Sequence, residues 1–129
     1  FDPKAGLIRH GTRYPLHVGD REMSWQNLMF ALETVRTYRM MPDSSFRAYI
    51  PGRFLMGADG LIQLARHNDY LLPQWFDPYR KTAQVQGDEP DLGVIYEPWQ
   101  IGTYSYLMLE AATLTGEERY LREARAGLN

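Results

Sequence analysis

The sequence predicts an all-α protein of antiparallel helical hairpins with a loop-rich N-terminal segment, and three observations support this prediction. Apolar residues recur at helical spacing in two adjacent stretches, residues 99–114 and 117–128. The link between these stretches is so short that the two helices have to lie antiparallel and side by side. A third apolar stripe at helical spacing occupies residues 20–41 and stops at Pro42.

Composition and charge limit the size of the core and the kinds of partner. The 129 residues, 44% of them hydrophobic, can bury one core, which corresponds to one small domain or part of one. The 14 basic and 16 acidic residues leave a formal charge of −2, without the positive excess that nucleic acid or an anionic membrane surface selects. No apolar run approaches the roughly 18 residues of a membrane span. We therefore expect a soluble chain that binds neither nucleic acid nor membrane, while the absence of cysteine leaves its compartment open.

Residues 1–19 are expected to form a loop-rich segment, because five prolines and glycines interrupt them and leave room only for a short extended piece at Gly6–Arg9. Residues 20–129 form the helical-hairpin region, which we expect to be part of one larger domain. The chain begins with Phe1, and Asn129 follows directly on a helical pattern, so we expect both ends to be cut. The remainder of the same protein, or neighbouring subunits, would then be partners of this chain.

The first predicted helix spans residues 20–41, with Asp20 or Ser24 as its N-cap. A second helix is predicted after Pro51, although Gly57 and Gly60 each weaken a helix by about 1 kcal/mol relative to alanine. The apolar stripes of the two helices consist of Trp25, Leu28, Met29, Leu32 and Val35, and of Phe54, Ala58, Leu61, Ile62 and Ala65.

The middle of the chain predicts a shorter helical segment followed by a long loop. Asn68 or Asp69 is expected to cap a segment that runs through Phe76. Residues 77–98 are rich in proline and glycine, and loops of this length inside compact domains are often functional. This loop is therefore the first place to look for a site.

The turn between the last two helices has the pattern of a capping box. We expect the Thr115 hydroxyl to accept a hydrogen bond from the backbone N–H of Glu118, and the Glu118 carboxylate to reach back. The run from Leu61 to Leu71 also resembles the run from Leu109 to Leu121, in the order helix, short polar turn and Tyr-Leu. Either a helical unit occurs twice, or two amphipathic helices are alike by coincidence.

Two runs, Glu97-Pro98-Trp99-Gln100 and residues 109–121, resemble a helical hairpin of the α/α-toroid superfamily. This superfamily includes many glycoside hydrolases, polysaccharide lyases and sugar epimerases. The resemblance covers residues 97–128 best and residues 52–76 loosely. It implies that the chain is a fragment of a closed ring of five or six hairpins, with a carbohydrate or another small molecule as ligand.

The acidic and aromatic residues before residue 99 are the candidate carbohydrate site. Glycosidic chemistry needs a carboxylic acid, often a second carboxylate, and an aromatic face on which a sugar ring can stack. Glu97 and Asp91 are the candidate acid or base, and Tyr96 and Trp99 are the candidate substrate-binding residues. In the structural alternative the acidic residues form a solvated loop, Glu97 favours the helix dipole and Trp99 packs inside.

A second candidate site lies in Arg9-His10-Gly11-Thr12-Arg13-Tyr14-Pro15, which resembles the signature of histidine acid phosphatases. The resemblance implies that His10 is the nucleophile that takes up a phosphoryl group, with Arg9 and Arg13 holding the phosphate oxygens. The alternative is a turn in which these side chains serve the structure or another ligand.

Three functions follow from these patterns. The first is a toroid fragment that acts on carbohydrate by hydrolysis, elimination or epimerisation. The second is a phosphomonoester hydrolase that uses His10, and the third is a non-catalytic helical-repeat scaffold whose aromatic loops bind protein. We expect no metal and no cofactor, because the three histidines are scattered and no nucleotide-binding glycine pattern occurs.

Overall fold

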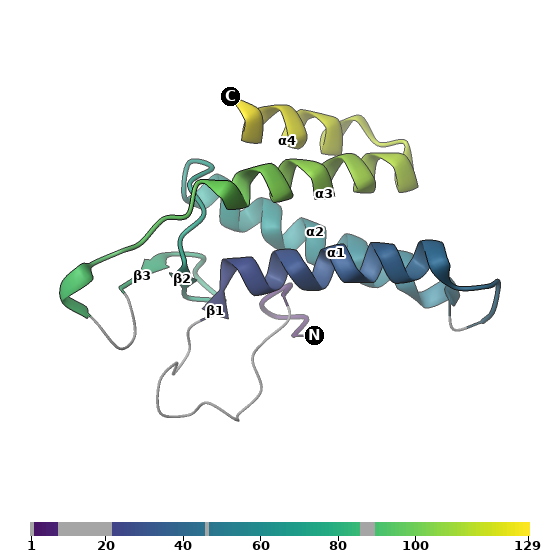
Figure 1. Ribbon diagram of the computed structural model, residues 1–129, viewed down its shortest axis with the longest axis horizontal. Helices are drawn as coiled ribbons and strands as arrows, with labels where there is room; N and C mark the ends of the chain where they lie inside the picture. The colour runs from purple at the N-terminus through teal and green to yellow at the C-terminus, as the bar shows by residue number, and fades with distance from the viewer. Residues whose placement is uncertain (1, 8–21, 46, 86–89) are drawn as a thin grey trace.

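The computed structural model describes residues 2–7, 22–45, 47–85 and 90–129 (Figure 1). Within these ranges the protein is mainly helical, as predicted, and has a small antiparallel sheet that the sequence did not predict. The helices are α1 (Ser24–Met40), α2 (Ile50–His67), α3 (Trp99–Thr115) and α4 (Glu118–Leu128), with the short 3-10 helices η1 (Arg47–Tyr49) and η2 (Pro90–Leu92). The strands are β1 (Glu22–Met23), β2 (Trp75–Phe76) and β3 (Ala83–Gln84), in the order β1-β2-β3.

The helices stack on one another and bury a common core. Helix α3 packs against α1, α2 and α4, and α4 lies on the outer side of α3 (Figure 1). None of these helices is long and apolar enough to cross a membrane. The predicted stripe of α2 faces this core, as do Leu28, Leu32 and Val35 of the α1 stripe, whereas Trp25 and Met29 are not part of it. Its fully buried members include Leu28, Val35, Phe54, Leu61, Leu64, Tyr104, Leu107, Met108 and Tyr120.

Helix α2 makes a close contact with the N-terminal segment through Gly60. A Cβ atom at this position would lie far inside van der Waals contact of the Gly6 carbonyl oxygen. Ala5 and Leu7 are buried, and Leu7 forms an isolated antiparallel bridge with Asp2. The absence of a side chain at Gly60 therefore lets the backbone of residues 2–7 lie directly on α2.

Helices α3 and α4 form the predicted antiparallel hairpin. Gly127, at the end of α4, lies against Tyr104 and Ser105 in the first half of α3. Met108 of α3 and Tyr120 of α4 are fully buried. Residues 99–128 thus fold as their apolar periodicity predicted.

The predicted capping box between these helices is wrong. Thr115 is still part of α3, where its hydroxyl donates to the Ala111 carbonyl oxygen at 2.8 Å and accepts from the Glu117 N–H at 3.1 Å. Gly116 ends the helix in the left-handed conformation, φ 71°, and its N–H donates to the Ala112 carbonyl oxygen at 2.7 Å. A glycine C-cap takes the place of the threonine N-cap, because glycine adopts this conformation without a Cβ clash.

The expected N-cap at Ser24 is also wrong, and the alternative Asp20 lies outside the described residues. Ser24 is the first residue of α1, and its buried hydroxyl donates to the Pro73 carbonyl oxygen at 2.5 Å. Among the described residues, no side chain caps this helix end. Ser24 therefore connects the start of α1 to the segment that leads into β2.

The helical segment expected between Asn68 and Phe76 does not form. Asp69 and Tyr70 have positive φ angles of 52° and 62°, so the chain leaves the helical direction there. Trp75 and Phe76 then pair with both other strands. Because Tyr70 lies in a turn whereas Tyr120 lies inside α4, the two similar runs do not form the same helical unit, which leaves the alternative of coincidence.

Candidate functional site

The candidate phosphatase residues Arg9, His10 and Arg13 lie outside the described residues. Their role stays a prediction. The candidate carbohydrate residues are described, and they lie where the chain passes from the small sheet into α3.

The segment before α3 is held in an extended conformation by residues 72–74. The Gln74 N–H donates to the Ile95 carbonyl oxygen at 2.7 Å, and the Glu97 N–H donates to the Leu72 carbonyl oxygen at 3.4 Å. Pro73 and Tyr96 form an isolated antiparallel bridge between these two bonds. Tyr96 and the residues that follow it are therefore placed by backbone pairing with a distant part of the chain.

Two aromatic side chains of this segment face solvent. The Trp99 side chain, in the first turn of α3, is 56% exposed, and Tyr96 is 43% exposed. The structural alternative that packed Trp99 inside is therefore wrong. Trp25 and Trp75 are both less exposed than Trp99, which makes Trp99 the best placed of the three to contact a ligand.

Glu97 lies between these two rings in sequence, and a buried amide holds its carboxylate. Gln100 is fully buried, and its Nε2 donates to Glu97 Oε2. The two residues are three positions apart, Glu97 just before α3 and Gln100 in its first turn, and the Gln100 N–H also donates to the Glu97 carbonyl oxygen at 3.0 Å. Gln100 is a member of the site that the sequence analysis missed, although the spacing could have indicated it.

The carbonyl oxygen of the Gln100 side chain is the second notable atom of this amide. Gln100 Oε1 is a buried acceptor for which the described part of the chain offers no donor. Buried polar atoms are nearly always paired, so one without a partner calls for an explanation. The Glu97 carboxylate and this oxygen belong to one hydrogen-bonded unit at the start of α3.

Asp91, the other candidate acid or base, lies in η2 and is exposed. It precedes Glu97 in the same acidic segment. Asp88 and Glu89, also part of the candidate loop, lie outside the described residues.

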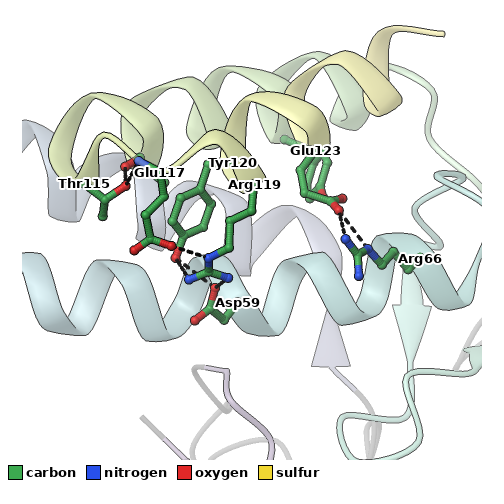
Figure 2. Close-up of polar contacts among 9 residues, drawn as sticks. Asp59, Arg66, Thr115, Glu117, Arg119, Tyr120 and Glu123 are labelled. Atoms are coloured by element: carbon green, nitrogen blue, oxygen red, sulfur yellow. Dashed lines mark hydrogen bonds and ion pairs between the residues drawn. The ribbon is translucent and has the colours of Figure 1, made fainter.

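A second group of polar side chains joins α2 and α4, and its centre is Glu123 (Figure 2). This carboxylate is 3% exposed and accepts hydrogen bonds from the Tyr70 hydroxyl at 2.8 Å, the Tyr104 hydroxyl at 2.9 Å and Arg66 Nε at 2.8 Å. Burial raises the pKa of Glu123, but the hydrogen bonds from Tyr70, Arg66 and Tyr104 outweigh this and hold it below its ordinary value. Burial also raises the pKa of Tyr104. The phenol therefore stays protonated and donates, while the Glu123 carboxylate stays ionised and accepts.

A related cluster lies one turn further towards the start of α4 (Figure 2). Asp59 of α2 accepts from Arg119 Nη1 and from the Tyr120 hydroxyl, both at 2.9 Å. Arg119 also pairs with Glu117 and lies over the Tyr120 ring, 4.1 Å from its centre. Every charged group in the two clusters has a partner of opposite charge, so we interpret them as contacts that hold α4 against α2.

Lys81 is a buried cation that connects two segments of the chain. Its Nζ donates to the Ala5 carbonyl oxygen at 2.5 Å and to the Pro78 carbonyl oxygen. Burial lowers the pKa of Lys81. The side chain ties residues 2–7 to the turn before β3.

A cavity of about 330 Å³ lies at the connection between α1 and α2. Arg47 is the only basic residue that lines it. Its guanidinium already donates to the Tyr38 carbonyl oxygen at 2.9 Å and to the Asp43 carboxylate at 2.5 Å, and it lies over the Tyr38 ring. The cavity is lined by Tyr38, Asp43, Ser44, Arg47, Ala48 and Pro51. None of these is a residue that the sequence indicated as functional.

Among the described residues, no group of three or more His, Asp or Glu side chains is arranged to hold a metal ion. The comparisons with known proteins add no family. The sequence matches no protein-family model, and neither a curated protein nor a solved structure matches the chain.

Proposed function

We propose that the chain is part of a helical protein of the α/α-toroid type that acts on a carbohydrate, with Tyr96, Glu97 and Trp99 contacting the sugar. The observation that carries the proposal is a carboxylate flanked in sequence by two solvent-exposed aromatic rings and held by the buried amide of Gln100. An exposed tryptophan contributes little to the core, so the exposure of Trp99 next to the hydrogen-bonded Glu97 suggests a role other than folding.

The chemistry of these groups suits a sugar. A pyranose ring presents an apolar C–H face, which stacks on an exposed indole or phenol ring, and a rim of hydroxyl groups, which donate to a carboxylate. Trp99 would supply the stacking face and Glu97 the acceptor. The bond to Gln100 occupies Glu97 Oε2 and leaves Oε1 for the ligand.

For the reaction, Glu97 is the proposed acid or base and Asp91 the second carboxylate. Hydrolysis, elimination and epimerisation of sugars all require a group that moves a proton at the reacting carbon or oxygen, and a carboxyl group can do so. Both residues belong to the acidic segment before α3, and Asp91 is exposed.

The arrangement of α3 supports a role inside a larger helical assembly. Apart from Glu110, which is buried and paired with Arg39, α3 has no charged side chain. Tyr106 and Leu109 are exposed on it. A helix that is apolar on most of its faces is typical of the interior of a larger protein, which also supports the scaffold as a second candidate function.

The first prediction tests the sugar contact. Replacing Trp99 with alanine removes the stacking face, so the dissociation constant for a short oligosaccharide should rise at least about tenfold, as expected when one aromatic contact is lost. The measurement is calorimetric titration with oligosaccharides of several linkages, followed by titration of the variant with the tightest ligand.

Tyr106→Ala is the matched control, because Tyr106 is an aromatic residue on the same helix with a similar exposure. This variant should bind as the parent does. If no oligosaccharide binds, or if both variants bind like the parent, the carbohydrate proposal is wrong and the scaffold function takes its place.

A further inference from the structure

We infer that the cavity at the connection between α1 and α2 binds a small carboxylic acid, and that Arg47 holds the carboxylate of this ligand. The volume of the cavity, about 330 Å³, falls within the roughly 300 to 1,000 Å³ that is typical of small-molecule sites. The cavity lies at the end of α1 that is remote from the three strands (Figure 1). The inference concerns a different part of the molecule from the segment before α3, so it does not depend on the carbohydrate proposal.

The guanidinium group of Arg47 is held in place by Tyr38 of α1. Its Nε donates to the Tyr38 carbonyl oxygen at 2.9 Å, and its central carbon lies 4.2 Å from the centre of the Tyr38 ring. These two contacts fix both the position and the plane of the group. The planar fork of a guanidinium matches the two oxygens of a carboxylate, and a fork that is already fixed loses little freedom when a ligand binds.

One nitrogen of this group is available to a ligand. Nη1 donates to Asp43, whereas Nη2 has no hydrogen-bond partner among the described residues. Nη2 is not one of the buried side-chain atoms that lack a partner, so solvent reaches it. A ligand that enters the cavity can therefore accept a hydrogen bond from Nη2.

The ion pair with Asp43 shows which chemical group the guanidinium accepts. The Asp43 carboxylate lies 2.5 Å from Arg47 Nη1, yet the Asp43 side chain is 95% exposed. An ion pair with so exposed a partner contributes little to stability, so its partner can be exchanged at small cost. A ligand carboxylate can take the place of Asp43 and bind Nη1 and Nη2 together.

The other lining residues supply a hydroxyl group and an apolar wall. Ser44 Oγ accepts from the Arg47 backbone N–H at 3.1 Å, and the described part of the chain contains no acceptor for the hydroxyl proton. This proton can be donated to a ligand oxygen. Ala48 and Pro51 line the cavity with apolar side chains. The ligand that fits both features joins a carboxylate to an apolar body such as a ring.

The start of α2 favours an anion at the same place. Pro51 lies in the first turn of α2, and this turn contains no acidic residue. The helix dipole places about half a positive charge at this end of the helix. The two charged residues that line the cavity, Asp43 and Arg47, balance each other, so the dipole leaves a net attraction for a negative group.

The test is an NMR titration of the full chain at about pH 7, where carboxylates are ionised. Phenylacetate carries both a carboxylate and a ring, phenylacetamide has a neutral amide in place of the carboxylate, acetate lacks the ring, and inorganic phosphate is a different anion. Phenylacetate should shift the backbone amide signals of Ser44, Arg47 and Ala48. Its dissociation constant should be at least about fivefold lower than that of each other probe, because only phenylacetate uses both the fork and the apolar wall.

Two substitutions in the ion pair should change the binding of phenylacetate in opposite directions. Arg47→Gln should weaken it at least about tenfold, because the charged fork is lost. Asp43→Asn should strengthen it about 1.5- to 5-fold, because the variant lacks the carboxylate that competes for the guanidinium. Arg36→Gln is the matched control, since Arg36 is an exposed arginine of α1 that pairs with Glu33, and it should leave binding unchanged.

The Asp43→Asn variant keeps the test decisive if Arg47→Gln does not fold, because Asp43 is exposed and an ion pair with only a structural role predicts no gain in binding. Unchanged or weaker binding in Asp43→Asn would contradict the exchange of Asp43 for a ligand. Equal dissociation constants for phenylacetate and phenylacetamide would overturn the recognition of a carboxylate, and tighter binding of phosphate would overturn the assignment to a carboxylic acid. If about 50 mM phenylacetate shifts none of the three signals, the cavity is not a site for this class of ligand.

Discussion

Gly57 and Gly60 both lie inside α2, and the sequence assigns them the same effect, a weaker helix. The structure separates them. A Cβ atom at Gly57 would have no neighbour within 4 Å, whereas at Gly60 it would collide with the backbone of Gly6. The effect of an added methyl group therefore depends on a residue more than fifty positions away.

The prediction at this scale compares two alanine substitutions. Gly60→Ala should lower the free energy of unfolding by about 1 to 3 kcal/mol, because overpacking outweighs the gain in helix propensity. Gly57→Ala should raise it by up to about 1 kcal/mol, because only the propensity changes. Urea denaturation of the two variants measures both, and equal shifts in the same direction would contradict the contact between Gly60 and residues 2–7.

Trp99 and Glu97 show how far the sequence alone can predict the candidate site. The sequence placed both residues at the start of a helix and left open whether Trp99 packs inside. The bond from Gln100 to Glu97 joins residues three positions apart and is local. The exposure of Trp99 depends instead on how α3 packs and on how the chain before it pairs with residues 72–74, which no local pattern contains.

At the scale of elements, the α3–α4 hairpin shows how the correct helices can be joined by an unexpected turn. The apolar stripes predicted both helices, and the Thr-Gly-Glu sequence suggested a threonine N-cap. Thr115 instead stays in α3, and Gly116 makes the turn in the left-handed conformation. The glycine C-cap and the threonine N-cap compete for the same three residues, and the glycine prevails because only it takes a positive φ at no cost.

The structure of this turn predicts that an alanine substitution affects stability strongly at Gly116 and little at Thr115. Gly116→Ala should lower the free energy of unfolding by about 1 to 2 kcal/mol, the cost of a left-handed conformation with a Cβ atom. Thr115→Ala should change it by no more than about 0.5 kcal/mol, because the hydroxyl donates to a helix carbonyl oxygen and accepts from the exposed Glu117 N–H, which water can reach in the variant. Thermal denaturation of the two variants measures both changes. A large loss of stability for Thr115→Ala alone would mean that Thr115 caps α4 after all.

At the scale of the whole molecule, Glu123 connects three parts of the structure. Its carboxylate lies on α4 and accepts from Arg66 of α2, from Tyr70 of the following turn and from Tyr104 of α3. Because these bonds hold the pKa of Glu123 below its ordinary value near 4.5, the ionised form stabilises the fold. That contribution is complete above the ordinary value and is lost as the pH falls through the lowered one.

The corresponding prediction is a loss of stability in acid that depends on this one residue. Glu123→Gln should lower the free energy of unfolding at neutral pH by about 1 to 3 kcal/mol. The two tyrosine hydroxyls donate to one carboxylate oxygen and Arg66 donates to the other, so an uncharged amide, whose nitrogen cannot accept, loses the bonds on one side and the ion pair with Arg66. The stability of this variant should also fall less than that of the parent between about pH 6 and pH 3. Melting curves across this range measure both effects.

Glu118→Gln serves as the control, since Glu118 is exposed on the same helix. It should retain the acid sensitivity of the parent. If Glu123→Gln has the same pH dependence as the parent, the cluster does not contribute through its charge.

The sequence by itself determined the helices, because a stripe of apolar residues at a period of 3.6 is a local property that any packed arrangement has to respect. Residues 50–67 and 99–128 could be assigned in this way. Only the tertiary structure decided that residues 75–76 form a strand, that Gly60 touches Gly6 and that Trp99 is exposed at the start of α3. These features depend on groups that meet only when distant segments pack together, and the energy of such contacts overrides the weak local preferences of the residues involved.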